Sequence, residues 1–192
     1  YRNMLDWVVP IIVEKGGFAL SVANECESCE EDGWASYQEV AAFVENAVQH
    51  SHTINSDLAV GITQCGTYNE PSKLEYHRLV SDKCDVLMWN LYLPTEYKPN
   101  LALKTLSPAD YAANLDELIA AAGDKYILLQ EAGCSAGYET NSTIESSAQK
   151  QKEAVAVLFD KVQNTRIRAF FWFTMVDWSR ELTDSYTASL SG

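Results

Sequence analysis

Five short apolar runs alternate along the chain with longer segments in which apolar residues recur at helical spacing. Runs of this length, bounded by polar and turn residues, predict buried strands. They cover residues 18–24, 57–63, 85–92, 125–131 and 167–175. Helices are predicted over residues 3–15, 34–49, 72–79, 107–122 and 145–163. An alternation of strand and helix indicates repeated βα units around a parallel sheet.

Two of the predicted helices begin with residues typical of a helix start. Ser107 followed by Pro108 supplies a capping serine and a proline in the first turn. Ser72, with Glu75 three residues later, matches the capping-box pattern. Between them, the segment after residue 92 carries Pro94 and Pro99 and is expected to be a long loop.

The spacing of the strands leads to a fold prediction. Successive strands lie roughly 25–40 residues apart, which is the size of a βα unit. A closed barrel of this kind needs eight strands and about 250 residues, whereas the chain has 192. We therefore expect residues 1–192 to form a single partial (β/α)8 TIM-barrel domain of about five parallel strands, truncated at both ends. An open five-stranded α/β sheet, complete in itself, is the competing interpretation.

Two glutamates stand at the ends of predicted strands. Glu25 closes the first apolar run directly after Asn24, and Glu131 closes the fourth. The carboxyl ends of parallel strands meet at one rim, where the residues positioned for chemistry emerge. Cleavage of a glycosidic bond needs two carboxyl groups, one as acid/base and one as nucleophile or base. A single glutamate at a strand end is more often a solvated surface charge, so the interpretation depends on the pair.

Several short motifs follow one another in an order that is known from one group of enzymes. They are Asn24-Glu25, Trp89-Asn90-Leu91-Tyr92, Leu129-Gln130-Glu131-Ala132-Gly133 and Phe171-Trp172-Phe173. With them, nearly the whole chain resembles the strand-four to strand-eight portion of clan A glycoside hydrolases, which are retaining (β/α)8-barrel enzymes.

The resemblance implies a role for each motif. Glu25 matches the acid/base after the fourth strand, and Glu131 matches the nucleophile after the seventh. Tyr92 matches the aromatic residue that contacts the nucleophile. Trp172 matches the tryptophan that forms the floor of the sugar subsite, and Trp178 is a second candidate for that place.

The residue chemistry adds further candidates for substrate contact. Asn24, beside the acid, is able to bond a sugar 2-hydroxyl, and indole rings pack against the C–H faces of sugars. A tryptophan inside a phenylalanine-rich strand is nevertheless as often part of the core, which applies to Trp172. Gln64, at the end of the second predicted strand, is an additional subsite candidate.

Charge and cysteine content limit the other classes of function. The formal net charge is −13 and the sequence pI is about 4.5, so neither nucleic acid nor an anionic membrane is expected as a partner. Cys26 and Cys29 form a lone CxxC pair without further zinc ligands, and five cysteines leave at least one unpaired within the chain. We expect no metal and no cofactor. The three histidines match no catalytic triad motif.

The expected function is a retaining glycosidase that acts on a β-linked oligo- or polysaccharide. The alternative is a non-catalytic carbohydrate-binding or scaffolding barrel fragment, and a third possibility is a metal-dependent barrel enzyme. Unpaired strand edges around residues 18–24 and 167–174 predict self-association, or association with missing barrel segments. A secreted or extracellular location is expected, and the glycosylation sequon at Asn141 is compatible with it.

Overall fold

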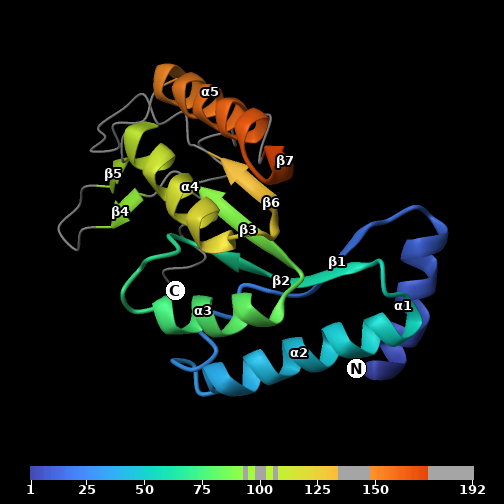
Figure 1. Ribbon diagram of the computed structural model, residues 1–192. Coiled ribbons are helices and arrows are strands. Elements are labelled where there is room, and N and C mark those ends of the chain that lie inside the picture. Colours follow the sequence, from blue (N-terminus) through green and yellow to red (C-terminus); the bar gives the residue numbers. More distant parts are fainter. Residues whose placement is uncertain (93–94, 98–102, 106–107, 134–147, 173–192) are drawn as a thin grey trace, which may run out of the picture.

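The computed structural model describes residues 1–92, 95–97, 103–105, 108–133 and 148–172. Within these ranges, five strands form one sheet in the order β1-β2-β3-β6-β7, and each neighbouring pair is parallel (Figure 1). The strands are β1 (Ala19–Asn24), β2 (Ala59–Cys65), β3 (Val86–Tyr92), β6 (Tyr126–Gly133) and β7 (Ile167–Trp172). Five parallel strands that alternate with helices confirm the predicted fold class.

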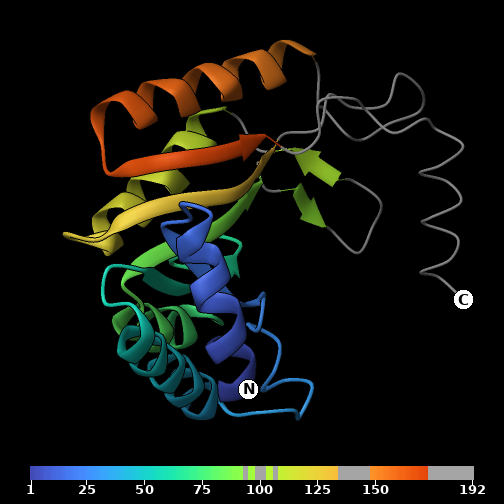
Figure 2. The same ribbon diagram turned by 90° about the vertical axis from the view of Figure 1, so that its right-hand side faces the viewer.

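The helices divide into two groups along the sheet. They are α1 (Arg2–Glu14), α2 (Tyr37–Ile54), α3 (Leu74–Lys83), α4 (Pro108–Ala122) and α5 (Ala148–Asn164). Helices α1 to α3 pack with β1 and β2, whereas α4 and α5 pack with β3, β6 and β7 (Figures 1 and 2). None of the helices in these ranges is both long and apolar enough to cross a bilayer.

The helix side of the sheet holds two separate apolar clusters. One joins α1, α2 and α3 to β1 and β2 and includes Leu5, Val44 and Tyr76. The other joins α4 and α5 to β3, β6 and β7 and includes Trp89 and Tyr111. Each of these five side chains is at most 1% exposed. The apolar area buried in each cluster is what stabilises that half of the fold.

The opposite face of the sheet, here called the inner face, is lined by small and medium side chains. Val86, Met88 and Leu128 form a buried cluster there, flanked by alanines on three other strands. These alanines are Ala19, Ala59 and Ala169. The cluster includes residues of all five strands, so it joins the two halves of the sheet across the inner face.

Several element boundaries differ from the predictions. Helix α2 begins at Tyr37, because Ser36 and Glu39 form a reciprocal capping box, so Trp34 lies before the helix and is 79% exposed. Helix α3 begins at Leu74 without a side-chain cap, since the hydroxyl of Ser72 donates to Glu70 instead. The predicted loop after β3 contains a short antiparallel pair, β4 (Thr95–Tyr97) and β5 (Leu103–Thr105).

Candidate active site

Glu25 follows β1 in an unusual backbone conformation. Its φ is 51°, in the left-handed region that residues other than glycine rarely adopt. Two contacts hold it there: its N–H donates to the carbonyl of Thr63 at 2.8 Å, and its Oε1 accepts from Nδ2 of Asn90 at 2.5 Å. Its carboxylate is therefore bound to β3, two strands away in the sheet, while the residue itself is exposed.

Glu131 is held by the same strand. A bulge in β6 places Glu131 opposite Asn90 in the register of β3 and β6. The phenol of Tyr92, at the end of β3, donates to Oε2 of Glu131. Burial raises the pKa of Tyr92, and the bond to Glu131, the charge of Glu131 and then the charge of Glu25 raise it further. The structure thus brings Glu25, Asn90, Tyr92 and Glu131 together at the carboxyl ends of the strands.

Asn90 is the buried member of this group. It is 1% exposed, and its Oδ1 is a buried atom without a hydrogen-bond partner among the described residues. Its Oδ1 is therefore an unused hydrogen-bond acceptor close to the carboxyl group of Glu25, to which its Nδ2 donates.

Below the glutamates, hydrogen-bonded polar side chains cross the inner face. The hydroxyl of Thr63 donates to Gln130 and is bonded to the hydroxyl of Ser21 at 2.7 Å. These three residues come from β2, β6 and β1. They link strands that are not all neighbours, and so they fix the relative positions of the strand ends that carry Glu25 and Glu131.

The other predicted substrate contacts are placed differently. Asn24 is exposed beside Glu25. Gln64 is fully buried and donates to Ser81 on α3, so the structure does not bring it to the rim. Trp172 packs with the helix-side cluster of α4 and α5, and Trp178 lies outside the described residues.

The alternation of side chains along β7 explains the position of Trp172. Ala169 packs on the inner face and Phe170 on the helix side. Because successive residues of a strand point to opposite faces, Trp172 shares the helix side with Phe170. Phe171 shares the inner face with Ala169 and is 66% exposed. The exposed aromatic ring on the inner face of β7 is therefore Phe171.

Two buried ionisable residues beside the site were missed from the sequence. Glu27 is 5% exposed and His77 is fully buried, and their nearest side-chain atoms lie 4.0 Å apart. His77 had a signal, since it lies beside Tyr76 and three residues before Val80 on the apolar face of α3. Glu27 had none, because it belongs to a run of acidic residues that looks solvated.

In the described part of the chain, the remaining histidines and the cysteines do not form a reactive centre. His50 pairs with Asp6, and His52 pairs with Asp85 at the amino-terminal start of β3, away from the rim. The described cysteines are all free, and burial raises the pKa of the Cys26 thiol to about 12. Among the residues that the structure places, no group of histidine, cysteine, aspartate and glutamate has the arrangement of a metal site.

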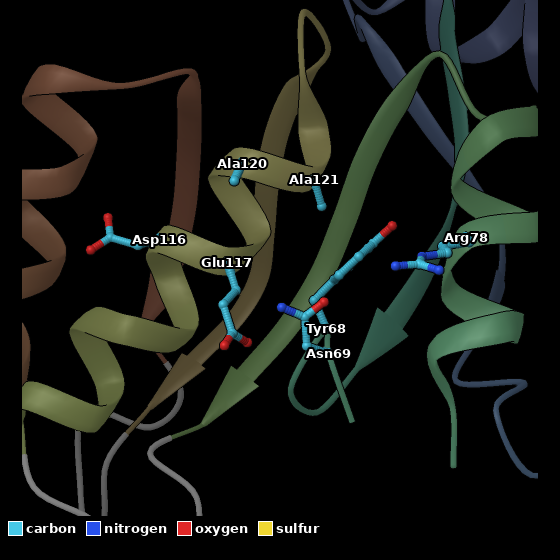
Figure 3. Close-up of a pocket in the computed structure, with 7 residues that line it drawn as sticks. All are labelled: Tyr68, Asn69, Arg78, Asp116, Glu117, Ala120 and Ala121. Atoms are coloured by element: carbon cyan, nitrogen blue, oxygen red, sulfur yellow. The ribbon is translucent and has the colours of Figure 1, made fainter. Parts of the chain in front are cut away.

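A pocket of about 520 Å³ lies elsewhere, between α3 and α4 (Figure 3). Its lining is Tyr68, Asn69, Arg78, Asp116, Glu117, Ala120 and Ala121. Since none of the rim residues lines this pocket, it is separate from the paired carboxylates.

Comparison with known proteins identifies the fold of the chain through solved structures alone. No protein-family model and no curated protein matches the sequence. Among solved structures, the family 17 β-1,3-glucanosyltransferase of Rhizomucor miehei matches 93% of this chain with a TM-score of 0.58 and 14% identity. The family 53 glycoside hydrolase catalytic domain of Ignisphaera aggregans matches 89%, also with a TM-score of 0.58 and 14% identity. The chain has the fold of part of a TIM-barrel glycosidase.

A third structure supports the same assignment of the fold. The family 2 β-galacturonidase of Eisenbergiella tayi, solved with galacturonate, matches 96% of this chain with a TM-score of 0.57 and 16% identity. The chain spans only part of each of these proteins, namely 64% of the glucanosyltransferase, 52% of the family 53 domain and 31% of the galacturonidase. At these identities the match establishes the architecture of the chain alone.

Proposed function

We propose that this chain carries the two carboxyl groups of a retaining glycoside hydrolase that acts on a β-linked carbohydrate. Glu25 is the acid/base and Glu131 is the nucleophile. One observation carries the proposal: both side chains are bound by residues of β3, Glu25 by Asn90 and Glu131 by Tyr92. Two carboxyl groups gathered at one rim are what double displacement requires.

In this mechanism Glu131 attacks the anomeric carbon while Glu25 gives its proton to the departing glycosidic oxygen. The C–O bond to the leaving group breaks, and an ester bond from Glu131 to the sugar forms. Glu25 then takes a proton from water, whose oxygen attacks the same carbon and releases Glu131. The Tyr92 phenol, which donates to Glu131, orients the nucleophile and holds its charge.

Asn90 suits an acid/base because its amide offers both a donor and an acceptor. Its Nδ2 donates to Glu25 when that side chain is a carboxylate. When Glu25 carries its proton, the same amide can turn and accept through Oδ1, which otherwise lacks a partner. Both protonation states that the cycle needs are therefore satisfied by one buried residue.

The proposal is tested with a panel of aryl β-glycosides and β-linked oligosaccharides. Glu25→Gln and Glu131→Gln each keep the side-chain shape and should lower turnover by at least about 10³-fold, the scale of losing a member of a catalytic set. Glu153→Gln, an exposed substitution on α5, is the matched control and should keep normal turnover. The anomeric configuration of the first product, read by NMR, should be retained.

The roles of the two glutamates are also distinguishable from one another by truncation. Azide should restore turnover to Glu25→Ala with a glycosyl azide of retained configuration, and to Glu131→Ala with one of inverted configuration, because the shortened side chain leaves room for azide to replace water in the first case and the nucleophile in the second. Normal turnover by either variant contradicts the assignment. Saccharide binding by the unaltered chain, without turnover of any member of the panel, supports the non-catalytic alternative.

A further inference from the structure

The loop that carries Glu25 is fixed by a second glutamate, Glu27. Its Oε1 accepts the backbone N–H of Cys65, the last residue of β2, at 2.6 Å. Its backbone carbonyl accepts from Nζ of Lys73 at 3.0 Å. Its Oε2 is buried and has no partner among the described residues. Glu27 therefore ties the Glu25 loop to the end of β2 while one of its own carboxyl oxygens remains unsatisfied.

The imidazole of His77 faces this carboxyl group in a defined tautomer. Its Nδ1 lies 2.8 Å from the carbonyl oxygen of Tyr68. A carbonyl oxygen only accepts, so Nδ1 carries a hydrogen, and Nε2 of the neutral ring is an acceptor. That Nε2 lies 4.0 Å from Oε1 of Glu27 and has no hydrogen-bond partner in the described part of the chain.

This arrangement favours a proton on Glu27. Without one, a lone pair of His77 and a carboxylate face each other in a buried site, where neither is solvated. An ion pair would place two charges in that site at a distance too long for a hydrogen bond, and the cost of desolvating both is large. A neutral carboxylic acid beside a neutral imidazole buries no charge.

Burial acts in the same direction on both partners. It raises the pKa of the Glu27 carboxyl, and the nearby charge of Glu25 adds to this effect, whereas the hydrogen bonds from Cys65 lower that pKa in part. Burial also lowers the pKa of His77. Both shifts favour the acid form of Glu27 and the neutral form of His77 over the ion pair that the 4.0 Å distance suggests.

We propose that Glu27 is a neutral carboxylic acid in the folded chain, beside a neutral His77 ring, and that it is the positioning residue for Glu25. Its role toward Glu25 rests on the proposed function, whereas its protonation state does not. The neutral form matters because a charged Glu27 would place a second negative charge next to Glu25. That charge would change the free energy of proton transfer to and from Glu25.

The ionisable and charged groups that interact with this pair come from three segments. They are Glu25 and Cys26 in the loop after β1, Cys65 and Glu70 at and after β2, and Lys73 and Tyr76 at the start of α3. The charge of Lys73 lowers the pKa of His77, and that of Glu70 raises it. The charge of Glu25 raises the pKa of Glu27.

The pair has a characteristic effect on stability. If Glu27 and His77 are both neutral in the folded chain, as proposed, then between pH 4.5 and 6.5, the ordinary values of the two groups, the folded and the unfolded chain each hold one proton on the pair. Within that range the pair adds no pH dependence. Below pH 4.5 the unfolded chain binds more protons, and stability falls as the pH falls. Above pH 6.5 the folded chain binds more protons, and stability falls as the pH rises.

The first experiment reads the proton directly, in the intact chain and in Glu27→Gln. The infrared spectrum of the intact chain at pH 6 should contain a protonated-carboxyl C=O band that Glu27→Gln removes. The ¹⁵N shifts of His77 should be those of a neutral ring with hydrogen on Nδ1. An imidazolium pattern for His77, or no difference band, overturns the neutral-acid assignment.

The second experiment follows unfolding by urea across pH. Glu27→Gln keeps an acceptor for Cys65 and supplies an N–H to His77, so it should fold normally. Because glutamine does not titrate, the loss of stability above pH 6.5 should disappear and the acid loss should begin near 6.5 instead of 4.5. An unchanged pH profile overturns the proposal.

The third experiment separates positioning from catalysis. Glu27→Ala removes the anchor to Cys65, so hydrogen exchange of the Glu25 amide, which is bonded to Thr63, should become faster, and in Glu27→Gln it should not. If the chain is a glycosidase, kcat should fall by about 100-fold in Glu27→Ala, the cost of misplacing a reacting group by about 1 Å, and KM should change little. Unchanged exchange in Glu27→Ala overturns the positioning role, whereas absence of turnover in the intact chain counts only against the proposed function.

Discussion

The side-chain amide of Asn90 donates to the carboxylate of Glu25 at 2.5 Å, although 65 residues separate the two in the sequence. Asn90 also stands opposite Glu131 in the register of β3 and β6. A single buried residue on the central strand is thus next to both glutamates, and the geometry of the pair depends on that strand.

Replacing Asn90 by leucine tests this dependence. Removing a hydrogen bond to a charged group costs about 1.5–3 kcal/mol. If that loss falls on the transition state, kcat drops roughly 10- to 150-fold. Gln64→Leu is a matched control, since Gln64 is an equally buried amide on the helix side of the sheet. Both variants should lose stability in urea, and only Asn90→Leu should lose turnover. Equal kinetic losses in both would show that the effect comes from folding.

Tyr92 should titrate above its ordinary value of 10.0, because burial and then Glu131 disfavour its phenolate. The folded chain therefore keeps this proton above pH 10, so the contribution of Tyr92 to stability is complete below pH 10 and is lost as the pH rises through the folded pKa. An ultraviolet titration of the intact chain minus that of Tyr92→Phe isolates the group. In the Glu131→Gln background the midpoint of this Tyr92 titration should move toward pH 10. A midpoint that Glu131→Gln leaves unchanged would contradict the contact between Tyr92 and Glu131.

Phe171 and Trp172 are neighbours that should respond in opposite ways. Phe171→Ala removes an exposed ring from the inner face and should weaken saccharide binding with little change in stability. Trp172→Ala opens the helix-side cluster and should cost roughly 2 kcal/mol or more in urea unfolding. Affinity is measured by calorimetry with a β-linked oligosaccharide. If only Trp172→Ala loses affinity, then Trp172, and not Phe171, contacts the sugar.

Gly61 on β2 leaves no room for a side chain beside the backbone of β3. A Cβ at this position would lie 2.5 Å from the carbonyl oxygen of Val86, so Gly61→Ala should push the two strands apart and cost about 1–3 kcal/mol. Gly33→Asn, in open space at a φ of +70°, is the control and should be nearly neutral. Urea unfolding of both variants checks the difference. Equal stability of the two variants would mean that the strands adjust without strain.

The sequence predicts the sheet well because its strands are buried on the helix side and partly on the inner face, so they read as continuous apolar runs. It fails where a shift of one residue along a strand changes the face to which a side chain points. Along β7, such a shift decides whether Trp172 or Phe171 lies on the inner face. It also fails for β4 and β5, three residues each, which carry no recognisable period. The start of α2 was readable, since Ser36 and Glu39 have capping-box spacing.

Buried polar contacts could not be predicted from the sequence for a different reason. The proximity of Glu27 to His77 joins residues 50 positions apart in a way that no local pattern encodes. The same holds for the bond from Asn90 to Glu25. Residue types and strand ends locate the candidate glutamates, whereas the residues that hold them depend on register and bulges.

The two glutamates belong to different halves of the core. Glu25 follows β1, whose side chains pack with α1 to α3, and Glu131 lies on β6, which packs with α4 and α5. These halves meet at the pairing of β2 with β3 and at the small inner-face cluster. A saccharide that contacts both carboxyl groups is therefore a cross-link between two packing units. Its binding should make the chain unfold in a single, more cooperative transition, because either half can then separate only after the ligand has left.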